Sequence, residues 1–277
     1  MNAEKIFTRA EFWKKKSHCL SMDLRLRSLA DARKFVKEHS IVLWDAKAEL
    51  PNLLDAILGR IANGKERELG KAAENCKLWR EQLLCEPDFV ECRFFRKFST
   101  AIHQDLWPFI TVFARLNREK VEEGDLLSRD AKKILNYLKR EGPTLKNQVR
   151  KALKYTSTGD ARLFQKAKME LHSYLILAIR NESAKKEEGP ILDLWENSMP
   201  RPVKTAADKI TETEAGAKLL SASLNSSVLS CEKQLPKWFT WANGESVDWA
   251  ESLLANRTFM RVARRGDNWI IPRKILQ

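Results

Sequence analysis

Residues 162–174, RLFQKAKMELHSY, carry side chains suited to nucleic-acid recognition. Arginine and glutamine have the hydrogen-bonding geometry for guanine and adenine edges, and lysine suits phosphate oxygens. At helical spacing, the polar stripe of this segment consists of Arg162, Gln165, Lys166 and Met169. The opposite, apolar stripe consists of Leu163, Phe164, Ala167, Leu171 and Tyr174. The pattern predicts an amphipathic helix whose polar stripe enters the major groove of DNA; a merely solvated stripe is the alternative.

A second candidate DNA contact follows this helix. Residues 175–195, LILAIRNESAKKEEGPILDLW, read as two apolar strands around a charged tip that ends in Gly-Pro. Lys185 and Lys186 lie in the tip, beside Glu187 and Glu188. We predict a β-hairpin wing whose two lysines contact DNA.

The elements that precede residue 162 position this helix. SRDAKKILNYLKREGP has a Ser128 N-cap, an apolar stripe and a Gly-Pro stop, and TLKNQVRKALKY predicts a second short helix. STGD at residues 157–160 forms a turn that caps the third helix and directs its positive dipole end toward a phosphate. Three helices followed by a two-stranded hairpin are typical of a winged helix-turn-helix.

The C-terminal part repeats this plan after the linker MPRPVKTAA at residues 199–207. Helical segments are predicted over residues 212–223, 232–239 and 244–256, and a hairpin over residues 259–271. The outward positions of the last helix are Glu245, Asp248 and Glu251, which would meet phosphates with like charge. We therefore expect no base reading by this helix. Its core face is predicted to consist of Val247, Trp249, Ala250, Leu253 and Leu254.

The fold class expected is mainly α with small β-hairpins, built from tandem winged helix-turn-helix modules. Four parts are predicted: a basic N-terminal arm or loosely attached helix over residues 1–27, a helical module over 28–124, a winged helix over 125–198, and a second winged-helix-like module over 199–277. Within the helical module, residues 89–116 are dense in aromatic side chains and must be largely buried.

Composition favours a polyanionic partner. The 277 residues carry a formal net charge of +13, and 43% of them are hydrophobic, enough for folded domains. The longest apolar runs, such as LILAI, are far shorter than a membrane span. Five cysteines without a C-x-x-C pair suggest a reducing compartment. We expect a cytoplasmic monomer, nucleoid-associated if bacterial, that binds double-stranded DNA and no membrane.

Several stretches together resemble the AlkZ/YcaQ-type family of crosslink-repair DNA glycosylases, and more closely its shorter AlkZ-related members. The resemblance covers about residues 30–274. It is carried by ARKFVKEHSIVLW, ELPNLLDAILG, LWREQLLCEPDFVECRFFRKFSTAIHQDLWPFI, SRDAKKILNYLKREGPTLKNQVRKAL and LFQKAKMELHSYLIL. It implies tandem winged helices that cradle duplex DNA. The family's catalytic Q-x-Q or Q-x-D motif has no counterpart, because no glutamine here has Gln or Asp two residues later.

Catalytic residues therefore stay unknown, and the sequence holds no motif for a cofactor or a metal. His18 and Cys19 are adjacent, a poor arrangement for a nucleophile and its base. Asp45 and Glu49 near Trp44 form a weak acid cluster, and His172 is expected at the exposed edge of the reading helix. Three functions remain open: DNA binding linked to repair, a glycosylase with a non-standard catalytic residue, and a protein-interaction module.

Overall fold

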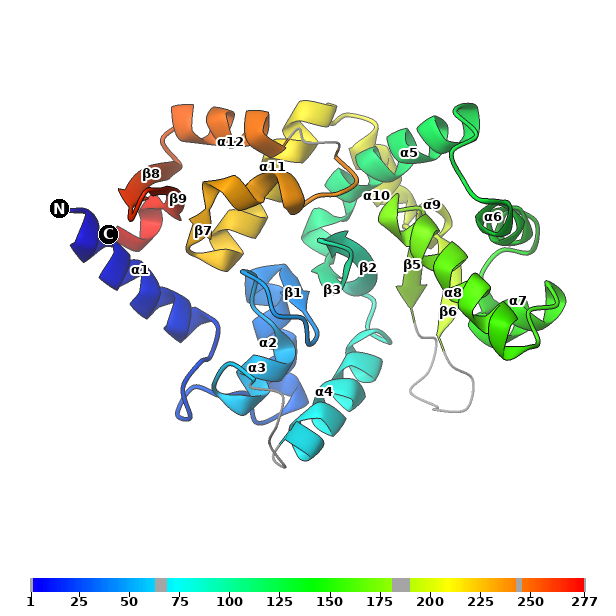
Figure 1. Cartoon of the computed structure of the whole chain (residues 1–277), viewed down its shortest axis with the longest axis horizontal. Helices are drawn as coiled ribbons and strands as arrows, with labels where there is room; N and C mark the ends of the chain where they lie inside the picture. The colour runs from blue at the N-terminus through cyan, green and yellow to red at the C-terminus, as the bar shows by residue number, and fades with distance from the viewer. Residues whose placement is uncertain (1, 63–68, 181–189, 243–245, 277) are drawn as a thin grey trace.

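The computed structural model describes residues 2–62, 69–180, 190–242 and 246–276 (Figure 1). It is mainly helical with two antiparallel sheets, as the sequence predicts. One order of elements occurs three times along the chain: helix, strand, helix, helix, strand, strand. We call these segments the first, second and third repeats.

The bounds of the elements show this order directly. The first repeat contains α2 (Leu29–His39), β1 (Ile41–Leu43), α3 (Leu53–Leu58), α4 (Leu69–Leu83), β2 (Phe89–Phe95) and β3 (Phe98–His103). The second contains α6 (Arg129–Glu141), β4 (Thr144–Leu145), α7 (Lys146–Ala152), α8 (Thr158–Ser173), β5 (Leu177–Arg180) and β6 (Ile191–Leu194). The third contains α11 (Glu212–Ser227), β7 (Ser230–Cys231), the 3-10 helix η2 (Glu232–Lys237), α12 (Ser246–Ala255), β8 (Phe259–Arg264) and β9 (Asp267–Pro272).

The remaining elements connect or flank the repeats. They are α1 (Ala3–Ser17), η1 (Gln104–Leu106), α5 (Trp107–Glu123), α9 (Trp195–Ser198), α10 (Arg201–Ala207) and η3 (Arg273–Leu276).

Strand order is the same in all three repeats, because the last strand lies between the other two: β1-β3-β2, β4-β6-β5 and β7-β9-β8. The sequence predicts helices followed by a final hairpin for the second and third repeats only. The first two repeats share one six-stranded sheet, since β2 pairs with β5 where Glu91 faces Ile179. The first repeat thus contains three strands besides its helices. One sheet joins strands from before and after residue 124.

The N-terminal segment is attached more firmly than the arm that the sequence suggests. In α1, the side chains of Ile6 and Phe7 are buried in a cluster with residues of β8, β9 and η3. Arg264 of β8 donates to Glu4 and Glu11, and its guanidinium lies 4.5 Å from the centre of the Phe7 ring. Helix α1 and the third repeat therefore lie side by side, and the chain ends are close together in Figure 1.

The largest core cluster extends from β2 and α5 to α11 and α12. Trp249 is buried there, as predicted, against Phe113 and directly over Gly216 of α11. A Cβ at position 216 would lie 2.1 Å from the indole, so only glycine admits this packing. Val247 was expected in the same core but is 42% exposed. The residues of α12 that pack inward are Ser246, Trp249, Ala250 and Leu253, which leaves Val247 outside this stripe.

Candidate nucleic-acid interface

The polar stripe of α8 lies on the surface. Arg162, Gln165 and Lys166 are exposed, and Met169 is partly buried. Lys185 and Lys186, the predicted wing contacts, lie outside the described residues. Phe164, Ala167 and Leu171 are buried as predicted, but Leu163 is 49% exposed, so its assignment to the core is wrong.

Two caps fix the position of α8. Ser157 and Asp160 form a capping box, in which the Ser157 hydroxyl accepts from the Asp160 N–H at 3.1 Å and Asp160 accepts from the Ser157 N–H at 3.0 Å. Near the other end, Glu170 accepts from the backbone N–H of Ser128 at 2.7 Å, which ties α8 to the start of α6. Hydrogen bonds from Ser157 hold the pKa of Asp160 below its usual range, so this carboxylate stays ionised.

Positive charge dominates the two helices of this region. Residues 146–173 contain seven cations and two carboxylates: Lys146, Arg150, Lys151, Lys154, Arg162, Lys166 and Lys168 against Asp160 and Glu170. Both carboxylates are engaged in the caps. An Asp160 carboxylate at the start of α8 also occupies the end of the helix where a phosphate was expected.

The inner flank of α8 faces the first repeat. Lys168 and His172 are buried there, only 8% and 1% exposed, and α8 contacts β2. The expectation of an exposed His172 is therefore wrong: contact with β2 turns this flank inward and Leu163 outward. Burial and the nearby Lys168 and Arg93 lower the pKa of His172 to about 3. Neither of its ring nitrogens has a well-formed hydrogen bond within the described chain.

Lys168 belongs to a group of four cations from four elements, which we call the junction cluster. Its members are Arg80 of α4, Arg93 of β2, Lys146 of α7 and Lys168 of α8. Burial, then the positive charges of Lys146 and Arg93, lower the pKa of Lys168 to about 8. Within the described residues, Lys168 has no ion-pair or hydrogen-bonded side-chain partner.

Glu91 binds Arg80 of the junction cluster, its charge also acts on Lys168, and its oxygens already accept several hydrogen bonds. The indole N–H of Trp44 donates to Glu91 at 2.8 Å, and Arg80 donates two hydrogen bonds of 2.7 Å. Ser99 donates another from its hydroxyl. The acid beside Trp44 is thus Glu91 and not the predicted pair, because Asp45 is exposed and Glu49 binds Arg96. The signal missed in the sequence is a single acid inside the apolar strand FVECRFF.

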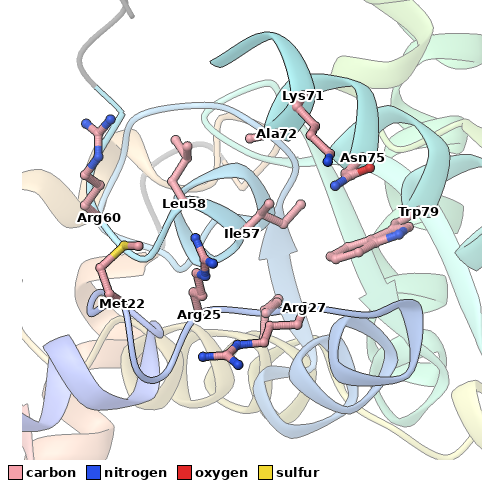
Figure 2. Close-up of a pocket in the computed structure, with 11 residues that line it drawn as sticks. Met22, Arg25, Arg27, Ile57, Leu58, Arg60, Lys71, Ala72, Asn75 and Trp79 are labelled. Atoms are coloured by element: carbon pink, nitrogen blue, oxygen red, sulfur yellow. The ribbon is translucent and has the colours of Figure 1, made fainter. Parts of the chain in front are cut away.

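A pocket of about 550 Å³ lies against the helix-turn-helix of the first repeat (Figure 2). Its described lining holds four cations and no carboxylate: Arg25, Arg27, Arg60 and Lys71. Asn75, Trp79 and several apolar side chains complete it. The sequence does not predict this site, because Arg25 and Arg27 fall in the segment expected to be an arm or a loosely attached helix, and the pocket forms only where α3 and α4 lie beside them.

A family model described as "AlkZ related" matches residues 26–240. The chain belongs to the AlkZ-related family. Among solved structures, the DNA glycosylase AlkZ of Streptomyces sahachiroi matches with a TM-score of 0.50 and 11% identity, over 95% of this chain and 70% of that one. At this identity the match shows a shared fold. A comparison with curated proteins found no relative.

The adjacent pair His18 and Cys19 is poorly suited to catalysis in this AlkZ-related protein. The His18 imidazole lies 2.8 Å from the carbonyl oxygen of Ser226, and burial lowers its pKa well below the usual range. Burial also raises the pKa of the Cys19 thiol, so this pair makes a poor nucleophile and base. No helix in the described ranges is long and apolar enough to cross a membrane.

Proposed function

We propose that this AlkZ-related protein binds double-stranded DNA in a repair context, with α8 as its reading helix. The observation that carries the proposal is the imbalance of charge over α7 and α8, where both carboxylates are engaged in caps. A surface of unopposed cations attracts phosphates and releases the counterions of DNA.

Each part of this region has a role in the proposal. Arg162 and Gln165 contact base edges, Lys166 contacts a phosphate, and Met169 supplies an apolar contact. Lys185 and Lys186 contact the backbone from the wing. Arg93 and Lys146 of the junction cluster hold further phosphates, and the protein acts as a monomer. The basic pocket of the first repeat offers an additional backbone contact.

Salt dependence of duplex binding tests this proposal. The logarithm of the association constant should fall linearly as the logarithm of salt concentration rises, with a slope of roughly −0.9 for each neutralised phosphate. Fluorescence anisotropy with a labelled duplex measures this slope. Binding that does not respond to salt, or no binding, would leave the protein-interaction module as the better account.

A glycosylase activity is the second candidate, favoured by the fold shared with a DNA glycosylase. The family's glutamine motif is absent from this sequence, so we expect no base release from crosslinked or N7-alkylated duplexes. Release above an enzyme-free control would establish the enzyme instead of the binder.

A further inference from the structure

We propose that Lys168 is a nucleophile that forms an imine with the aldehyde of an abasic site in bound duplex DNA. This inference rests on the proposed DNA binding and adds a covalent activity to it. The surrounding cations attract a polyanion, and the lysine amine reacts with an aldehyde. An abasic site in DNA combines both features.

The geometry singles out Lys168 among the lysines of α8. It is 8% exposed on the flank that faces β2, whereas Lys166, two residues earlier, is exposed to solvent. His172, one turn further along α8, lies on the same buried flank.

Among the described residues, Glu91 is the carboxylate whose charge raises the pKa of Lys168, and burial and the neighbouring cations outweigh it. Glu91 already accepts hydrogen bonds from Trp44, Arg80 and Ser99. Arg93 and Lys146 add positive charge instead. A lysine desolvated beside other cations is a recognised form of activated amine nucleophile.

The lowered pKa enlarges the reactive fraction of this side chain. With a pKa of about 8, about one Lys168 in ten is neutral at pH 7. A lysine with an ordinary pKa is neutral in only about three of ten thousand molecules. The reactive fraction is thus larger by roughly two orders of magnitude.

The reaction needs no oxidant, reductant or cofactor. The neutral amine of Lys168 adds to C1′ of the ring-opened abasic sugar and forms an N–C1′ bond. The resulting carbinolamine loses its oxygen as water and gives the protonated imine. Loss of the C2′ proton to water then expels the 3′-phosphate, and hydrolysis of the imine returns the free lysine.

Borohydride trapping tests the proposal on the full-length protein. Sodium borohydride reduces the imine to a stable amine, so a protein–DNA adduct should appear on a denaturing gel with an abasic duplex. Its rate should rise as the pH increases toward and through about 8, since the neutral amine reacts. Lys168→Arg, which keeps the charge, should abolish the adduct while duplex affinity stays within a few fold. Lys37→Ala, at an exposed lysine of α2, is the control and should retain the adduct.

Peptide mapping of the wild-type adduct makes the result independent of how the variants fold. DNA attached to Lys168 supports the proposal, and attachment to another residue overturns it. If anisotropy shows duplex binding but no adduct forms, the imine proposal fails and the DNA-binding proposal stands. If the wild-type protein binds no duplex, both fail.

Discussion

The second and third repeats share one order of elements and one strand order, yet their third helices carry opposite charge. Within the described residues, Arg162 and Lys166 of α8 form no ion pair, whereas α12 includes Asp248 and Glu251 and no cation. Two arginines near α12 are engaged in ion pairs: Arg261 binds Glu232 and Glu251, and Arg264 binds Glu4 and Glu11. The same topology thus carries an excess of cations in one repeat, and in the other an acidic helix beside two arginines that are bound to carboxylates.

Burial follows the same division. The third repeat contributes Trp238, Trp241 and Trp249 to the largest core cluster. There they contact Phe94 and Phe95 of β2 and Phe113 of α5. The second repeat has its own smaller core. We infer that the third repeat supports the fold and the second repeat meets the partner.

The largest expected effect is on stability in the third repeat. Trp249→Ala should lower the free energy of unfolding by about 3–5 kcal/mol, because it leaves a large cavity over Gly216. Val247→Ala on the same helix should change it by less than about 0.5 kcal/mol, since this side chain is largely exposed. Denaturant unfolding measures both. An unchanged unfolding midpoint in Trp249→Ala would contradict the supporting role of the repeat.

A smaller effect concerns pH and the buried flank of α8. His172 stays neutral in the folded protein down to a pKa of about 3, whereas the unfolded chain binds a proton below about 6.5. Its contribution to stability is therefore lost as the pH falls from about 6.5 toward 3, by up to roughly 1.4 kcal/mol per pH unit.

The comparison variant is His172→Leu, which removes the titrating group and leaves an apolar side chain. Its stability should fall less steeply with decreasing pH than that of the wild-type protein, when both are measured by urea unfolding. Parallel curves would show that His172 does not stay neutral in the fold. Lys168 and Arg93 face this histidine, and their positive charges act in the same direction.

A weaker effect is expected from the basic pocket of the first repeat. Arg25→Ala combined with Arg27→Ala should reduce duplex affinity by several fold and flatten its salt dependence, if the pocket holds a phosphate as proposed. Lys34→Ala combined with Lys37→Ala removes the same charge from the exposed surface of α2 and is the control. Equal reductions in both variants would show that the pocket acts only through its contribution to the net charge of the protein.

The helices of the second repeat could be predicted because their signals are local. Ser128 caps α6, Gly142 follows its end, and Ser157 with Asp160 caps α8. Strand β2 of the first repeat could not be predicted because it is buried along almost its whole length, so FVECRFF lacks the alternation that marks a half-exposed strand.

The inner flank of α8 could not be predicted for a different reason. Helical periodicity locates one apolar stripe, but the burial of Lys168 and His172 depends on β2, about 80 residues away in sequence. The junction cluster likewise joins side chains from four elements. The sequence does predict the outline of the third repeat, and helical phase alone predicts the acidic face of α12.

The central claim is that charge on α8, and not on α12, governs DNA binding. The most direct measurement compares salt-dependent duplex affinity for Arg162→Ala combined with Lys166→Ala and for Asp248→Ala combined with Glu251→Ala. The first variant should bind more weakly, with a slope of log K against log salt flatter by about one unit for each phosphate that is no longer neutralised. The second should keep the wild-type slope. A folded first variant with unchanged affinity and slope would show that α8 is only a solvated face and would contradict the account.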